Sequence, residues 1–386
     1  MYSKAVDAAD KLSYSTFYRL WSRNFNIGFA NPRVDVCTTC EQLNHRLRQC
    51  KDSEKVDLMT QLRIHKLRSK TFYDMLRKRS PDSYDIAYDL QQVHSLPKLP
   101  VQEAFYSRQL GLYNFGLCDL SSGKKFCYTW LESDAGRGSV EIGSAVFSYI
   151  THELSQSDAY KQVRKLRLFS DGCGGQNKNN NIVAMAFTYL ILHAPENVKE
   201  IELIFPVRGH SFLPCDRLFG RIEKSLKGID TITLPSTFHH IFKQHADQVK
   251  VLGRDWELFD WKVPAKALRK VAKIQEAKRI FLSKQPEGVV NVRTELFYRV
   301  DVGKQAQLHK AMHVPVPEPP TVTVGREIPE AKLTDIHKLL TATYGERWMD
   351  KPDLQLYKNL KTTLLGAPDT PNSLCNCCDF DIGMHI

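Results

Sequence analysis

Two stretches of the sequence place acids, glycines and amides where a strand gives way to a helix. Leu166–Asn181 (LRLFSDGCGGQNKNNN) is an apolar run that ends on Asp171 and continues into glycines and amides before a helical pattern. Phe205–Glu223 (FPVRGHSFLPCDRLFGRIE) repeats this plan and carries Asp216. Because ligands of open α/β sheets bind at the carboxyl ends of strands, the two stretches predict one site.

A third acid, Asp89, ends the alternating, strand-like run YDIAYDL. Three carboxylates gathered by a sheet and a helix repel one another unless a cation lies between them, and hard oxygen ligands suit Mg²⁺ or Mn²⁺. Two such ions would serve an in-line phosphoryl transfer. We predict Asp89 and Asp171 as ligands, with either Asp216 or Glu223 as the third, and we prefer Asp216 because it lies nearer the strand end.

His210 precedes Asp216 in the second stretch and is predicted to be a further ligand or a proton shuttle, since an imidazole suits either role. A purely structural interpretation is also open, in which Asp171 caps its own turn and Asp216 caps its helix. That interpretation explains each acid singly, but it does not explain why all of them fall at one end of the predicted sheet.

The glycines that follow Asp171 can adopt positive φ, so successive backbone N–H groups could surround a phosphate. The amides beside them suit a phosphate backbone or single-stranded bases. The loop lacks the GK[ST] signature of a Walker A motif, which disfavours nucleoside triphosphate hydrolysis. Basic side chains flank the same turns and could make electrostatic contacts with the nucleic acid. The alternative is that they are ordinary solvent-exposed residues. The predicted nucleic-acid-binding residues are Gly174, Gly175, Gln176, Asn177, Lys178, Arg208 and Arg217.

The pair Cys37-x-x-Cys40 has the spacing of a zinc knuckle, and thiolates with imidazoles suit tetrahedral zinc. We predict His45 as a third ligand and His65, on the next helix, as a fourth, with Cys50 as a spare. The alternative is that Cys37 and Cys40 are two buried thiols that bind no metal. A second cluster, Cys375, Cys377 and Cys378, is not expected to form a complete zinc site.

The elements that must position the acids follow the order β–β–β–α–β–α–β–α. Asp89 lies on the first strand, Asp171 ends the fourth, and Asp216 or Glu223 lies on the last helix. This is the order of an RNase H-like mixed sheet flanked by helices, so an α/β fold is predicted. Four segments are expected: residues 1–80, helical with the CxxC motif; 81–245, the RNase H-like core; 246–314, a small basic helix and β module; and 315–386, a proline-rich linker, short helices and a tail.

The formal net charge of +11 over 386 residues favours a polyanionic partner, DNA first. The plainer alternative is that this charge serves only solubility. A homo-oligomer is the second partner that we consider. Neither a secretory leader nor a run long enough to cross a bilayer is recognised, and the ten cysteines do not suggest a disulfide scaffold. A nuclear or cytoplasmic protein without membrane attachment is therefore expected.

Several segments resemble a family of transposon-derived proteins found in animal genomes. They are DVCTTC, YDLQQVHSLPKLP, FYSRQLGLYNFGL, YTWLESDAGRGSVEI, LFSDGCGGQNKN and GHSFLPCDRLFGRIEK, and the resemblance covers roughly residues 15–360. It implies an integrase-type (DDE/DDD) transposase core with Asp89, Asp171 and Asp216 as the acids, and it implies zinc at Cys37 and Cys40. Fuller members begin earlier, so an upstream DNA-binding segment is expected to be absent.

These patterns predict a DNA-processing protein that cleaves or transfers strands by metal-dependent phosphoryl transfer at an acidic triad. The alternative is a catalytically silent module that keeps the fold and binds nucleic acid or another protein. The two hypotheses differ in whether Asp89, Asp171 and Asp216 converge.

Overall fold

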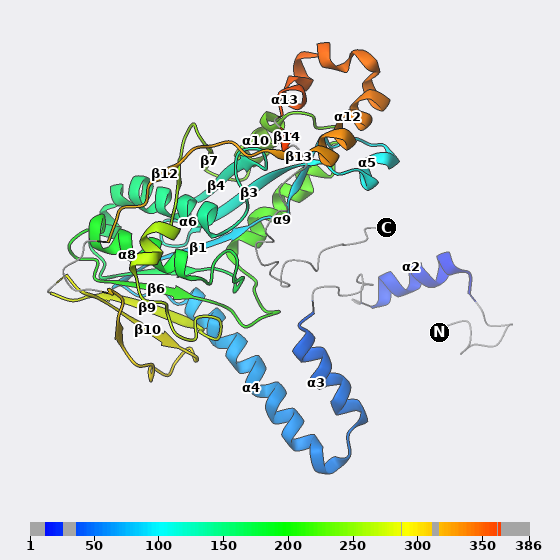
Figure 1. The fold of residues 1–386 in the computed structure, drawn as a ribbon. Helices are drawn as coiled ribbons and strands as arrows, with labels where there is room; N and C mark the ends of the chain where they lie inside the picture. Colours follow the sequence, from blue (N-terminus) through cyan, green and yellow to red (C-terminus); the bar gives the residue numbers. More distant parts are fainter. Residues whose placement is uncertain (1–11, 26–35, 287, 311–315, 361, 364–386) are drawn as a thin grey trace.

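A computed structural model describes residues 12–25, 36–286, 288–310, 316–360 and 362–363 of the chain (Figure 1). The predicted cluster of Cys375, Cys377 and Cys378 lies outside the described residues. None of the described helices combines the length and the apolar character that crossing a bilayer requires.

The described chain begins with the predicted helical segment, made of α2 (Tyr14–Asn24), α3 (Thr38–Gln49) and α4 (Asp52–Arg77). Figure 1 shows α3 and α4 as a hairpin that projects from the body of the protein, with α2 standing apart. Only the carboxyl-terminal end of α4 joins the core, where Phe72 and Leu76 pack among residues of the sheet.

Ten strands form one mixed sheet in the order β11-β10-β9-β6-β5-β1-β3-β4-β7. β2 pairs with the first residues of β3, which precede the part of β3 that pairs with β1. Their bounds are β1 Ser83–Leu90, β2 His94–Leu96, β3 Leu110–Asp119, β4 Lys125–Leu131, β5 Lys165–Phe169, β6 Glu200–Ile204, β7 Gln248–Val251, β9 Arg279–Lys284, β10 Val290–Glu295 and β11 Ala306–Gln307.

The centre of this sheet confirms the predicted RNase H-like topology. β1, β3 and β4 pair antiparallel, and Gly123, with φ of 81°, makes the turn between β3 and β4. β5 then lies parallel to β1 on its other side, and β6 lies parallel to β5. The order β4-β3-β1-β5-β6 is the one in which acids on the first and fourth strands become neighbours.

Helices cover both faces of the sheet. α6 (Ser139–Ser148) and α8 (Asn180–Leu192) contribute to the larger core, whereas α9 (Pro214–Leu226) and α10 (Pro235–Lys243) contribute to a second core on the other face. α8 is apolar on nearly all sides because α6, α11 and the sheet surround it. α9 is amphipathic and buries Leu218, Phe219 and Ile222 against the sheet.

The strands β9, β10 and β11 extend the same sheet, because β9 pairs antiparallel with β6. The predicted carboxyl-terminal β and helical region is thus present, while the four-segment division of the chain stays a prediction. Two short pairs, β8 (Leu258–Phe259) with β12 (Thr321–Val322) and β13 (Ile328–Pro329) with β14 (Thr362–Thr363), lie outside the main sheet. The other described α-helices are α5 (Gln102–Tyr106), α7 (Asp158–Lys161), α11 (Lys262–Ala267), α12 (Glu330–Tyr344) and α13 (Gln355–Lys358).

Candidate functional site

The register of β1 and β5 brings Asp89 beside Asp171. These strands run parallel, with Asp85 opposite Arg167 and Ala87 opposite Phe169. Two residues further along each chain lie Asp89, which is still within β1, and Asp171, which follows β5. Both carboxylates are therefore at the same edge of the sheet, where the neighbouring strands β1 and β5 end.

Helix α9 brings Asp216 to this edge. Its second residue, Cys215, is fully buried, and its thiol lies 3.3 Å from the carbonyl oxygen of Gly116 and 3.5 Å from that of Ala87. Gly116 is the register partner of Asp89 on β3, and a Cβ at this glycine would come within 2.5 Å of the Phe219 ring. The close approach of α9 to the sheet thus depends on the missing side chain of Gly116, and it places Asp216 near Asp89.

Burial raises the pKa of all three carboxylates, and neighbouring acids contribute to the rise at Asp89 and Asp216. Burial raises the pKa of Asp89 well above its usual value, and the charges of Asp171 and Asp216 raise it further. Burial also raises the pKa of Asp171, against hydrogen bonds from Asn177 and the backbone of Cys173. Burial likewise raises the pKa of Asp216, and Asp171 contributes to that rise. A cation among the three acids would remove this repulsion.

The structural interpretation of the acids also has support in the local contacts. One oxygen of Asp171, Oδ1, accepts hydrogen bonds from the Asn177 side-chain amide and from the Cys173 backbone N–H, the latter at 3.2 Å. One oxygen of Asp216, Oδ2, accepts from the backbone N–H of Leu213 at 2.7 Å and so caps α9. Each cap engages a single oxygen of its carboxylate, so capping and metal binding are compatible.

Glu223, the alternative third carboxylate, belongs to a different polar network. Its Oε1 accepts a hydrogen bond of 2.7 Å from the Gln91 side chain, which in turn accepts one of 2.7 Å from Asn114. His94 lies 3.9 Å from the same oxygen, but burial lowers the pKa of His94 to about 4, so the imidazole is neutral near pH 7. The structure therefore groups Asp216, and not Glu223, with Asp89 and Asp171.

The predicted nucleic-acid-binding residues divide into buried and exposed sets. Asn177 and Lys178 are buried, at 1% and 5% exposure. The Lys178 ammonium donates to the carbonyl of Gln275 at 2.7 Å, so this side chain holds the turn after Asp171 in place. Gln176 is half-buried and donates to the backbone carbonyl of Arg137. Gly174 is half-buried, whereas Gly175, Arg208 and Arg217 are exposed.

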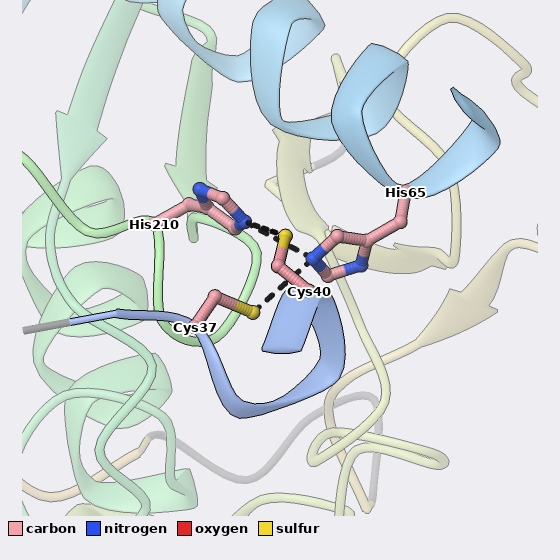
Figure 2. Close-up of side chains that lie close together, drawn as sticks. All are labelled: Cys37, Cys40, His65 and His210. Atoms are coloured by element: carbon pink, nitrogen blue, oxygen red, sulfur yellow. Dashed lines mark hydrogen bonds between the residues drawn. The ribbon is translucent and has the colours of Figure 1, made fainter. Parts of the chain in front are cut away.

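A second cluster combines two thiols with two imidazoles: Cys37, Cys40, His65 and His210. Figure 2 shows the four side chains converging from the start of α3, the middle of α4 and the loop between β6 and α9. Their donor atoms all lie within 4.8 Å of one another. Among the described residues, no other group of three or more His, Cys, Asp or Glu side chains has its donor atoms this close together. Asp89, Asp171 and Asp216 therefore do not form such a group.

The distances in this cluster fit a tetrahedral zinc site. The Sγ of Cys37 lies 3.2 Å from Nε2 of His65, the Sγ of Cys40 lies 3.4 Å from Nε2 of His210, and the two Nε2 atoms are 3.0 Å apart. With Zn–S bonds of about 2.3 Å and Zn–N bonds of about 2.0–2.1 Å, neighbouring donors would lie roughly 3.3–3.8 Å apart. The four residues can therefore hold a metal ion such as zinc after a small outward movement.

The ionisation of the cluster also suits a metal. Burial lowers the pKa of both His65 and His210, so each imidazole is in its neutral, ligating form near pH 7. Burial and the neighbouring Cys37 raise the pKa of Cys40, so a bound cation would favour the thiolate form of Cys40.

The predicted ligand set is corrected at one position, because His45 is not in the cluster. His45 lies on α3 five residues after Cys40, which turns it about 140° around the helix axis and moves it about 7.5 Å along it. His45 is exposed. The fourth member is instead His210, which the sequence suggested as a partner of the acids and which the structure places against Cys40 and His65.

Residues 119–298 match the model of a family described as Domain of unknown function (DUF7869). No curated protein matches the sequence significantly. The DUF7869 match includes Asp171, His210 and Asp216. Asp89 and the other three members of the Cys/His cluster precede it, so both candidate sites combine residues from inside and outside the matched segment.

Proposed function

We propose that the protein processes DNA by metal-dependent phosphoryl transfer, with Asp89, Asp171 and Asp216 as ligands of Mg²⁺ or Mn²⁺. The observation that carries this proposal is that acids on β1, after β5 and on α9 lie at one end of these strands, where Asp171 and Asp216 raise the pKa of Asp89 and Asp171 raises that of Asp216. Carboxylate oxygens are the ligands that both ions prefer. When bound, such ions stabilise the attacking and leaving oxygens of an in-line displacement.

The residues around the acids have supporting roles in this proposal. The Asn177 amide and the Leu213 backbone N–H each hold one carboxylate oxygen, which orients Asp171 and Asp216. The exposed guanidinium groups of Arg208 and Arg217 can neutralise phosphates of the nucleic-acid backbone. The resemblance to transposon-derived proteins favours DNA as the substrate and strand cleavage or transfer as the reaction.

The alternative function is a silent module that binds nucleic acid or protein and uses the acids only as caps. The hydrogen bonds that Asp171 and Asp216 accept from neighbouring backbone N–H groups favour this alternative. Those caps require no metal, so the two functions differ in their response to Mg²⁺ or Mn²⁺.

Nicking of supercoiled plasmid tests the proposal directly. The full chain is incubated with plasmid in buffer containing Mn²⁺, Mg²⁺ or neither, beside the Asp171→Ala variant. We expect nicked circles only from the wild-type protein and only with a divalent ion. Equal nicking by the variant would contradict the assignment of Asp171, and plasmid binding without nicking by either protein would favour the silent module.

Phe212 is expected to contribute to the binding of unpaired DNA next to the acids. Its side chain is 72% exposed although it lies between His210 and Asp216, and its backbone N–H donates to the Tyr73 hydroxyl at 3.2 Å. An exposed aromatic ring can stack on a base, an interaction worth about 1–3 kcal/mol. Phe212→Ala should therefore weaken the binding of single-stranded DNA by about 5- to 150-fold.

Fluorescence anisotropy of a labelled oligonucleotide measures this effect. Phe105→Ala is the matched control, because Phe105 is similarly exposed, at 78%, but lies on α5. Equal affinities of the Phe212→Ala and wild-type proteins would show that the ring does not stack on DNA.

A further inference from the structure

We infer that a zinc ion bound by Cys37, Cys40, His65 and His210 is a structural clamp that docks the α3–α4 hairpin onto the loop between β6 and α9. This loop leads directly into the helix that carries Asp216. The inference does not depend on the proposed reaction, because it concerns how the hairpin and the loop are held together.

The donor set indicates a structural rather than a catalytic ion. Two sulfurs and two ring nitrogens complete a tetrahedral shell, and a complete shell leaves no position for water or substrate. Two thiolates would balance the charge of Zn²⁺. The ligands come from three segments that are distant in the sequence, so one ion would close a long loop between His65 and His210.

The hairpin needs such a link because α3 buries little apolar surface of its own. Leu43 is the buried residue of this 12-residue helix. Isolated helices of this length are marginal in water, and most helical stability comes from the packing of an apolar face. α4, in contrast, inserts Phe72 and Leu76 into the core near its carboxyl-terminal end. A metal bond at Cys37 and Cys40 would therefore supply the attachment that packing does not give α3.

The loop side of the clamp is shaped to receive the knuckle. Gly209 adopts φ of 76°, and a Cβ at this position would lie 2.9 Å from the Cα and Cβ of Cys37. The Tyr73 hydroxyl, from α4, donates to the His210 carbonyl at 3.1 Å and accepts from the Phe212 N–H at 3.2 Å.

These contacts connect the metal ligand to the acid. The next backbone N–H after Phe212, that of Leu213, donates to Asp216 at 2.7 Å. His210 is thus linked to Asp216 by a short segment whose backbone is hydrogen-bonded at His210, Phe212 and Leu213. Release of the metal would free the start of this segment and loosen the position of Asp216.

Metal analysis of the purified full chain tests the site itself. We expect one zinc ion per chain in the wild-type protein, and cobalt substitution should give the intense visible bands of a tetrahedral, thiolate-bound ion. His210→Ala and Cys40→Ser should lose the metal, whereas His45→Ala and Cys50→Ser, the matched controls, should keep it. Substoichiometric zinc in the wild type, or full zinc in His210→Ala, would overturn the assignment.

Hydrogen exchange of the wild-type protein tests the clamp without relying on any variant that fails to fold. Removing zinc with a chelator should lower the protection of amides in residues 208–216 by about tenfold or more, the scale of a local opening. Adding zinc back should restore this protection. Protection in β3, at the centre of the sheet, should stay the same. Unchanged protection of residues 208–216 after complete zinc removal would refute the clamp. Because no nucleic acid is present, this result is independent of the plasmid assay.

Discussion

Asp89→Asn is expected to raise the stability of the protein in the absence of Mg²⁺ and Mn²⁺ while it strongly slows metal-dependent cleavage. Asp89 is half-buried and lies near two other carboxylates, so its charge is unfavourable without a cation. An amide of the same shape removes that repulsion, and we expect a gain of about 1 kcal/mol or more in the free energy of unfolding. A metal contributes several kcal/mol to such a reaction, so the cleavage rate should fall by roughly 10³-fold.

The raised pKa of Asp89 also predicts the direction in which the stability of the protein changes with pH. The folded-state pKa of Asp89 is raised above its unfolded value of about 3.9. The folded state therefore binds the proton more tightly, and stability falls as the pH rises from that value through the folded-state pKa. The wild-type protein should lose stability over this window, and Asp89→Asn should lose less of it.

Urea unfolding at several pH values, in zinc-containing buffer without Mg²⁺ or Mn²⁺, measures this difference. Addition of Mn²⁺ should stabilise the wild type and leave Asp89→Asn unchanged. Glu223→Gln is the control on α9, because Glu223 interacts with Gln91 and not with the acids; it should keep Mn²⁺ stabilisation and cleavage. An Asp89→Asn protein less stable than the wild type would contradict the repulsion argument.

The sheet and its acids could be predicted because the evidence for them is local. Each strand is an apolar or alternating run, and each acid stands at a fixed place relative to that run, as Asp171 does after the strand that ends at Phe169. The RNase H-like order then decides which strand ends become neighbours. The choice between Asp216 and Glu223 is also local, because Asp216 lies closer in the sequence to the end of the preceding strand.

The Cys/His cluster could be predicted only in part, because its geometry is not local. The CxxC spacing identifies Cys37 and Cys40, and the next helix supplies His65. The last ligand, His210, lies 145 residues after His65 in the sequence. Nothing near His210 in the sequence marks it as a partner of the two cysteines. Proximity in the chain favours His45, but the helix turns its side chain away from Cys40.

Burial decides other cases that the sequence left open. Asn177 and Lys178 have the composition of a phosphate-binding loop, but their side chains are used to fix the turn after Asp171. Conversely, nothing in the sequence distinguishes Tyr73 and Phe212 from other aromatic residues of helices and loops. Their importance comes from one hydrogen bond between two segments, which a pattern along the chain does not reveal.

Asp85→Ala is expected to lower the free energy of unfolding by about 3–5 kcal/mol, because it leaves the Arg167 guanidinium buried without its carboxylate. Asp85 is fully buried on β1 and Arg167 is 8% exposed on β5. Arg167 Nε donates to Asp85 Oδ1 at 2.7 Å, and Arg79 lies 3.3 Å from the other oxygen. Asp158→Ala, which removes an exposed ion pair with Lys161, is the control and should cost less than about 1 kcal/mol.

The same substitution should also reduce cleavage, since Asp85 and Arg167 are register partners on the strands that carry Asp89 and Asp171. A slip of one residue would turn Asp89 to the opposite face of the sheet and separate the two acids. Replacing both partners, in Asp85→Leu with Arg167→Met, should restore most of the stability, because an apolar pair of similar volume leaves no unpaired charge. Denaturant unfolding and plasmid nicking of Asp85→Leu, Arg167→Met and the double variant complete the cycle. A stable Asp85→Ala protein with wild-type nicking would show that the hydrogen bonds of the sheet hold the register of β1 and β5 without the ion pair.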